Sequence, residues 1–380
     1  MNKENKQKHW WRPVVIIFLI ILAGFVAGIG GELFTRYYLA NNSFFSDLYF
    51  TEQANVGQKE IVINEPRKVV VEQNLRIDQI KNDVQPILAG IYRKKTATKN
   101  ALDSAFLPTD YLGEAAVLTS DGWLISTQNT NVAAKYSVIV TNTKRIYEIE
   151  KVVTDTVTGI VFIKINVQNL PVIKISDNAN ITNGANVILY NNNSDKIELA
   201  QILNKRYKNM DDKYDYVYST QILDRLILLD KDFNPSYRGT AVFDFQGNVI
   251  GLVKSDNLVI PISYIKPIIS NVLKDEKIQR PYLGLNYINI AEVYGLSETQ
   301  TQNQQKGALI WNNAAGKSIA SDSPLFNKLT KGDIITKIEN QNIDKDNNLN
   351  DILLEYKIGQ EVKVKYFKDG QEGEVSIIIK

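Results

Sequence analysis

The chain has 380 residues, enough for two ordinary domains, and its 44% hydrophobic and 23% charged residues are typical of a globular protein. The formal net charge of +2 gives no reason to expect a nucleic-acid partner. The absence of cysteine excludes disulfides and cysteine-based metal sites, and no metal-ligand spacing or phosphate-binding glycine loop points to a metal or another cofactor.

The first predicted element is an apolar helix. Residues 14–31 carry no charge, and at ~1.5 Å per residue a helix of this length spans roughly 27 Å, close to the ~30 Å hydrocarbon core of a bilayer. Aromatic residues flank the run on both sides, as they do at membrane interfaces: Trp10, Trp11, Tyr37 and Tyr38. We predict a transmembrane helix over residues 13–34, with a cleaved signal peptide as the alternative.

The charges before this helix predict its orientation. Basic residues outnumber acidic ones there, so the positive-inside rule places residues 1–12 in the cytoplasm and everything after the helix outside it: Lys3, Lys6, Lys8 and Arg12 against Glu4. We therefore expect a single-pass cell membrane protein with extracytoplasmic domains. Residues 35–67 form a predicted stalk, which holds an aromatic cluster of Phe44, Phe45, Tyr49 and Phe50.

Residues 68–257 have a β-rich pattern. The predicted strands of this region are preceded by Leu75–Ala89, which we expect to begin as a short helix. Short apolar runs alternate with turn residues, and Asp121-Gly122 and Gln246-Gly247 mark hairpin turns. The predicted strands lie at Ala115–Leu118, Trp123–Ser126, Ser137–Val140, Ile160–Ile165 and Val187–Tyr190.

We interpret the charged, tyrosine-rich loop Asn204–Tyr218 as a solvated insertion. Residues 258–280 form a predicted linker, with a helix over Pro261–Lys277 on apolar residues three and four apart.

The stretch Asp230–Gly251 resembles the nucleophile loop of the HtrA family of trypsin-like serine proteases. Asn234-Pro235 and Gly239 match that loop, and Val249–Gly251 follows in register. Arg238 stands in the serine slot. Ser236 stands in the slot of a glycine that helps to shape the oxyanion hole. The resemblance implies a mainly β fold, namely a trypsin-like double β-barrel followed by a PDZ domain.

The other two catalytic slots are also substituted in this resemblance. Thr130 takes the histidine slot in the run from Asp121, and Gly159 takes the aspartate slot in the run from Asp155. The single histidine of the chain is His9, which precedes the predicted transmembrane helix. Acyl transfer at a serine needs a base and a carboxylate that orients it. The sequence therefore predicts a protein with no catalytic residues at these slots.

Residues 281–380 resemble a PDZ domain. Tyr282, Leu283, Gly284 and Leu285 match the carboxylate-binding loop of such domains, and Gly332–Ile335 matches a later strand motif. PDZ domains hold an extended C-terminus along a sheet edge and its carboxylate on backbone N–H groups. The opposite wall is predicted to be a helix over Asp346–Lys357, with Leu349, Ile352 and Leu353 on its apolar face. We expect a preference for an apolar final residue; a closed groove used only for packing is the alternative.

We interpret the chain as a catalytically inactive HtrA-like protein that binds C-terminal or unfolded peptide segments in protein quality control, as a sensor, scaffold or chaperone-like partner. Two alternatives stay open: a divergent serine endopeptidase, and a regulatory subunit of active homologues. The resemblance also raises a homotrimer or a mixed assembly as an expectation. Arg238 has a second interpretation, because a guanidinium in the former nucleophile pocket could bind a carboxylate.

Overall fold

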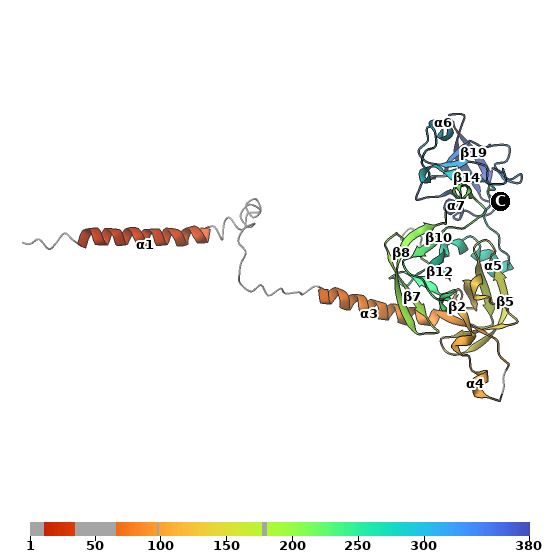
Figure 1. The fold of residues 1–380 in the computed structure, drawn as a ribbon, viewed down its shortest axis with the longest axis horizontal. Helices are drawn as coiled ribbons and strands as arrows, with labels where there is room; N and C mark the ends of the chain where they lie inside the picture. The colour runs from red at the N-terminus through yellow and green to blue at the C-terminus, as the bar shows by residue number, and fades with distance from the viewer. Residues whose placement is uncertain (1–10, 35–65, 97–98, 177–180) are drawn as a thin grey trace, which may run out of the picture. The chain divides into compact units, whose positions relative to one another are not determined.

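The computed structural model describes residues 11–34, 66–96, 99–176 and 181–380, and the chain separates into two compact units, Met1–Lys68 and Val69–Lys380. The first unit contains the helix α1 over Trp11–Phe34 (Figure 1). Over the part of the chain described, no helix combines the length and the apolarity needed to cross a membrane, so the predicted transmembrane helix over 13–34 is not confirmed. The aromatic residues of the predicted stalk lie outside the described residues.

The helix α3 spans Pro66–Val84 and leads into the larger unit. It therefore starts earlier than predicted and ends before Gln85-Pro86, where proline restricts the preceding residue and the chain turns into a short 3-10 segment. Ile80 and Val84, one helical turn apart, are buried against the core. The Arg76 guanidinium adds a hydrogen bond of 2.9 Å to the carbonyl oxygen of Phe245.

Two closed six-stranded barrels follow, which confirms the expected trypsin-like double β-barrel. The order in the first barrel is β1-β2-β3-β6-β5-β4, and all pairs are antiparallel. Alternating apolar residues fill its interior. Its strands are β1 Leu88–Arg93, β2 Tyr111–Val117, β3 Trp123–Thr127, β4 Ser137–Thr141, β5 Ile146–Thr154 and β6 Ile160–Ile165. A short helix, α4 (Ala101–Ser104), lies in the β1–β2 connection.

The second barrel has the order β10-β13-β12-β11-β7-β8. Its longest strand, β8, continues into the charged loop that precedes β9. The strands are β7 Asn186–Asn191, β8 Lys196–Tyr207, β10 Leu226–Leu229, β11 Ala241–Phe243, β12 Val249–Ser255 and β13 Leu258–Pro261. The predicted strands in both barrels are thus all present, and the turns predicted at Asp121-Gly122 and Gln246-Gly247 lie between β2 and β3 and between β11 and β12.

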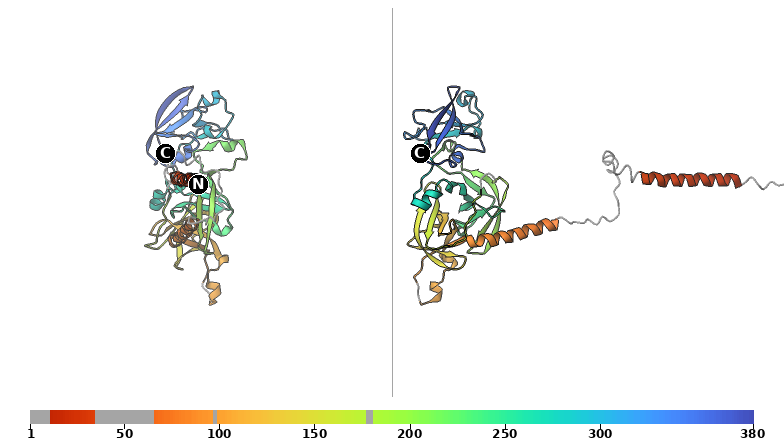
Figure 2. Two further views of the ribbon diagram at one scale, coloured as in Figure 1. Left: turned by 90° about the vertical axis from the view of Figure 1, so that its left-hand side faces the viewer. Right: turned by 180° about the vertical axis from the view of Figure 1, so that it is seen from behind.

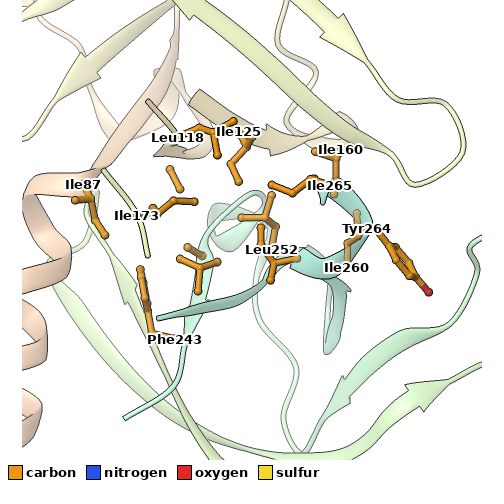
Figure 3. Close-up of a cluster of buried hydrophobic side chains, with 14 of the residues drawn as sticks. Ile87, Leu118, Ile125, Ile160, Ile173, Phe243, Leu252, Ile260, Tyr264 and Ile265 are labelled. Carbon is orange, nitrogen blue, oxygen red and sulfur yellow. The ribbon is translucent and has the colours of Figure 1, made fainter. Parts of the chain in front are cut away.

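The largest buried cluster joins the two barrels. Figure 3 shows Ile125 and Ile160 from the first barrel facing Leu252 and Ile260 from the second. Burial of such side chains contributes about 1.5–3 kcal/mol each relative to exposure. The cluster fixes the two barrels against each other, and with them the loops that run between the barrels.

The predicted linker helix is broken into two pieces. A 3-10 segment over Ile262–Ile265 is followed by α5 over Ile269–Asp275, because Pro267 cannot donate the hydrogen bond that a continuous helix would need. The predicted apolar face is nevertheless buried, as Ile265, Ile268 and Val272 have no exposed surface. The linker therefore packs on the barrels.

The C-terminal module is a sheet in the order β19-β18-β16-β15-β14-β9, with β17 beside β16. Figure 2 shows its later strands in blue, from two further directions. One strand, β9 (Tyr218–Ser219), comes from the loop before β10 of the second barrel. The other elements are β14 Asn286–Asn289, α6 Glu298–Thr301, β15 Ala308–Ile310, β16 Ile334–Ile338, β17 Gln341–Asn342, α7 Leu349–Leu353, β18 Glu361–Lys368 and β19 Gln371–Ile378.

Candidate functional site

The loop that carries Arg238 is a tight turn. Pro235–Tyr237 forms one 3-10 turn capped by Asn234, whose side chain accepts the Ser236 N–H at 2.9 Å. The Arg238 N–H bonds to the carbonyl oxygen of Pro235 at 3.3 Å. An oxyanion hole needs such N–H groups aimed outward at a developing charge. In this loop, both of those N–H groups are used inside the turn.

Thr130 lies next to this loop. Its hydroxyl donates to the carbonyl oxygen of Thr127 at 2.8 Å, and the side chain is buried. A β-carbon added at Gly113 would lie 2.5 Å from the Arg238 carbonyl oxygen and 2.6 Å from the Thr130 methyl group. Both Thr130 and the Arg238 backbone therefore lie beside Gly113, so the fold brings these two residues close together.

Gly159 lies close to the same place. Its carbonyl oxygen accepts the Gln128 N–H at 2.7 Å, and a β-carbon there would lie 3.2 Å from the Gln128 side-chain amide. The neighbouring carboxylate, Asp155, is buried and bonded to Thr158 and Arg280. Thr130, Gly159 and Arg238, the three positions identified by resemblance, therefore lie in neighbouring loops.

The half-buried Arg238 side chain makes no ion pair or hydrogen bond with the residues that the structure describes. The predicted carboxylate partner of its guanidinium therefore stays a prediction.

Sequence reasoning missed one titratable group beside the loop, the fully buried Glu114. Its carboxylate accepts hydrogen bonds from the Asn192 N–H at 3.0 Å and the Thr240 hydroxyl at 2.9 Å. Burial raises the pKa of Glu114 to about 8, and these hydrogen bonds only partly offset that rise. Glu114 and Thr240 have no exposed surface, so a substrate cannot reach them. An acidic residue inside the apolar run Leu112–Val117 is the signal that could have identified this group.

The residues of the predicted carboxylate-binding loop lie directly before β14. Leu283 and Leu285 are buried, and Gly284 has a φ of +66°, which L residues with a β-carbon rarely adopt. The predicted wall residues Leu349, Ile352 and Leu353 lie on α7 and are buried in the core of the module. Helix α7 itself is shorter than the predicted 346–357, since Asn348 caps its start.

The edge of β14 beside this loop carries the strand β9. Tyr218 pairs with Tyr287 and Ser219 pairs with Asn286 in an antiparallel register. The Thr220 N–H bonds to the carbonyl oxygen of Leu285 at 2.9 Å, and its hydroxyl accepts the Leu285 N–H at 3.0 Å. The loop Asn204–Tyr218, interpreted from sequence as a solvated insertion, therefore ends in a docked strand. This interpretation was wrong for Tyr218, which is only 4% exposed.

A buried polar cluster surrounds the Tyr218 side chain. The Tyr218 hydroxyl donates to Glu292 at 2.6 Å, and Arg225 binds both oxygens of the same carboxylate at 2.8 and 2.9 Å. The Arg225 guanidinium lies 4.3 Å from the Tyr218 ring centroid, and the Tyr287 ring packs at 5.7 Å. Burial raises the pKa of Tyr218; Arg225 opposes this rise and the bond to Glu292 adds to it, so the phenol stays a donor. No spacing pattern in the sequence points to this cluster, because Glu292 lies 67 residues after Arg225.

Comparison with known proteins finds a family match for the C-terminal module and similarity to several relatives along the chain. Residues 295–379 match the family described as PDZ domain. A "Probable periplasmic serine endoprotease DegP-like" from Marinomonas sp. (strain MWYL1) is 24% identical over 70% of this chain and 56% of its own length. "Serine protease Do-like HtrB" from Bacillus subtilis (strain 168) is 23% identical over 98% of this chain and 82% of its own length.

Two solved structures share the fold. The chain resembles "HtrA-type protease AlgW with tripeptide" with a TM-score of 0.55 and 18% identity, over 80% of this chain and 96% of the other. It resembles "HtrA-type protease AlgW with decapeptide" with a TM-score of 0.54 and 17% identity, over 80% and 97%. "Serine protease Do-like HtrA" from Bacillus subtilis is 29% identical, but only over 39% of this chain and 35% of its own length.

Proposed function

We propose that this chain, an HtrA-like protein with a C-terminal PDZ domain, binds the C-termini of other proteins without cutting them. The observation that carries the proposal is the Arg238 loop. The N–H groups of Ser236 and Arg238 bond within the loop, and no imidazole exists in the chain after His9. Without an oxyanion hole and a base, attack on a peptide bond loses its two main sources of acceleration.

The PDZ domain supplies the binding chemistry in this proposal. A sheet edge and the backbone N–H groups of Leu283–Leu285 hold an extended C-terminus, and Leu283 and Leu285 favour an apolar final residue. The name of the Marinomonas relative places that protein in the periplasm. We extend a location outside the cytoplasm to this chain, where it serves protein quality control as a sensor, scaffold or chaperone-like partner.

The test for catalysis is hydrolysis of fluorescently labelled unfolded casein by the full chain, with and without a peptide that ends in valine. An active HtrA-type protease serves as the positive control. We expect no turnover in either condition, because an activating peptide cannot supply absent catalytic groups. Turnover that co-purifies with the chain and is unchanged in Arg238→Ser would overturn the proposal by placing a catalytic site outside the three slots.

The test for binding is fluorescence anisotropy with two labelled peptides that differ only in a final valine or aspartate. We expect tighter binding of the valine peptide, because Leu283 and Leu285 offer no partner for a second carboxylate. Equal affinity for the two peptides would contradict the expected preference for an apolar final residue.

A divergent serine endopeptidase is the second candidate. It is favoured by the names of the relatives from Marinomonas and Bacillus subtilis, which are all called serine proteases or endoproteases. The casein assay separates the two candidates directly.

A further inference from the structure

The strand β9 lies where an external peptide would add to the PDZ sheet. The other edge of β14 is already paired with β15, so β9 covers the remaining edge. The pairs Tyr218–Tyr287 and Ser219–Asn286 continue into the hydrogen bond from the Thr220 N–H to Leu285. A peptide bound by strand addition would run along the same edge and make the same kind of backbone bonds.

Thr220 occupies the position of a final residue. Its hydroxyl oxygen accepts the Leu285 N–H, as one oxygen of a terminal carboxylate would. The N–H groups of Leu283 and Gly284 make no hydrogen bond with the residues that the structure describes. A single hydroxyl oxygen can accept only some of the hydrogen bonds that the N–H groups of this loop can donate. The two oxygens of a carboxylate can accept more of these hydrogen bonds. An external C-terminus would therefore gain bonds that the internal segment lacks.

Tyr218 identifies the side chain that the groove selects. It lies two residues before Thr220, and its hydroxyl reaches Glu292 while its ring packs on Tyr287. Both partners belong to the PDZ domain, so they stay in place when Tyr218 leaves. Asn350 on α7 closes the other side by donating to the carbonyl oxygens of Ser219 and Ile222, each at 2.8 Å.

Exposed chain flanks this segment on both sides. Residues 211–214 precede it and Gln221-Ile222 follow it, and the side chain of Ile222 is 52% exposed. A two-residue strand between exposed loops can leave its edge without unfolding either barrel.

We propose that Tyr218–Thr220 is an internal ligand of the PDZ groove. Partner proteins that end in tyrosine, any residue, and a valine- or threonine-like residue displace it. This inference rests on the proposed peptide binding and adds both the partner class and the competition. The Tyr218 pocket formed by Glu292 and Tyr287 determines the specificity at the third residue from the end.

The probe is a fluorescein-labelled peptide that copies residues 212–219 and ends in valine with a free carboxylate, DKYDYVYSV. Its affinity is measured by anisotropy for the full chain and for Tyr218→Ala. We expect Tyr218→Ala to bind at least about tenfold more tightly, because each lost hydrogen bond to a charged group weakens the internal competitor by roughly that factor. The same probe with a C-terminal amide, and one with phenylalanine in place of the third-last tyrosine, should each bind about tenfold more weakly.

A reversible lock gives a second measurement that does not depend on the stability of Tyr218→Ala. Ser219 and Asn286 are directly opposite, and the backbone bonds at Thr220 place them at a non-hydrogen-bonded pair, where Cα atoms lie ~4.5 Å apart. Because the chain has no cysteine, S219C/N286C introduces a single possible disulfide. Oxidised with diamide, the variant should not bind the probe; reduced with dithiothreitol, it should bind as the unmodified chain does.

The outcomes separate this inference from the proposed function. If the unmodified chain, Tyr218→Ala and the oxidised lock all bind the probe equally, Tyr218–Thr220 does not compete, and the inference fails while peptide binding stands. If no form binds any probe, including Tyr218→Ala with its fold verified by circular dichroism, the proposed peptide binding fails and the inference fails with it.

Discussion

In the proposed function, the Arg238 loop and the PDZ groove differ in the reason why each is closed to a substrate. At the Arg238 loop, the proposed function requires that the catalytic groups are missing, and the N–H groups of Ser236 and Arg238 bond within their own turn. At the PDZ groove the binding groups are present, but another part of the same chain occupies them. The first condition is fixed by the covalent sequence, whereas the second, as we infer it, is a conformational equilibrium. On this inference, only the groove can be opened by a partner.

The strongest test of this comparison is Arg225→Met, because it removes one member of the buried pair that anchors β9. The Arg225 and Glu292 side chains are 9% and 17% exposed. Breaking a buried ion pair leaves an uncompensated charge and costs about 3–5 kcal/mol. We expect a loss of this size in the free energy of urea-induced unfolding. Lys94→Met is the control, because its partner Glu148 is 63% exposed and such pairs contribute at most about 1 kcal/mol.

The next test concerns Glu114, the buried carboxyl group beside the Arg238 loop. Its pKa rises from the ordinary value of 4.5 to about 8 on folding, so the folded state holds the proton more tightly than the unfolded state. Stability should therefore be greatest below about pH 4.5 as far as this group is concerned, fall as the pH rises toward 8, and stay low above it. At about 1.4 kcal/mol per pKa unit the fall amounts to a few kcal/mol. Glu114→Gln should remove this slope in urea titrations from pH 5 to 9; an unchanged slope would contradict a buried neutral carboxyl.

Gly239→Ala tests whether the Arg238 loop is rigidly packed. A β-carbon there would overlap the carbonyl oxygen of Glu114 and the hydroxyl of Ser126, at a φ of +76°. We expect a destabilisation of about 2–4 kcal/mol from backbone strain and overpacking together. Gly247→Ala is the matched control, since its φ is +81° but nothing lies within 4 Å of the added carbon. Equal melting temperatures for the two variants would show a loop that yields to the extra atom.

The smallest expected effect is that of Thr220→Val, which keeps the shape and removes the hydroxyl that accepts the Leu285 N–H. We expect a loss of about 1 kcal/mol in stability, the net value of one such hydrogen bond, and faster amide exchange at Leu285. Ser219→Ala should leave the exchange at Leu285 unchanged, because the Ser219 side chain does not contact that amide. Protection of Leu285 in Thr220→Val equal to that in the unmodified chain would remove the role given to the hydroxyl.

The barrels were predictable because the residues that determine each strand and turn are adjacent in the sequence. The short apolar run Ile160–Ile165 by itself predicts a strand. The turn at Asp121-Gly122 contains the glycine that its positive φ favours. Helix ends were less predictable: Pro267 divides the linker helix and Asn348 delays the start of α7. Pro267 overrides a favourable apolar spacing, whereas Asn348 starts its helix just before the apolar face begins.

The residues around the Arg238 loop could be identified from the sequence, whereas the docking of Tyr218 on the PDZ domain could not. Thr130, Gly159 and Arg238 stand in recognisable frames, so their convergence could be predicted by resemblance. The docking of Tyr218 could not, since Arg225 and Glu292 are separated by 67 residues and their pairing follows only from the fold. A loop rich in charge and tyrosine has the same composition whether solvent or another domain surrounds it.

The pairing of β9 with β14 also sets a threshold for any partner. An internal ligand joined to its site by a short loop acts at an effective concentration on the order of millimolar, although no molecule of it is free in solution. A partner present at micromolar levels would therefore have to bind the open groove far more tightly than Tyr218–Thr220 does, or arrive clustered at high local density. The protein would then report crowding of suitable C-termini rather than the presence of any single one.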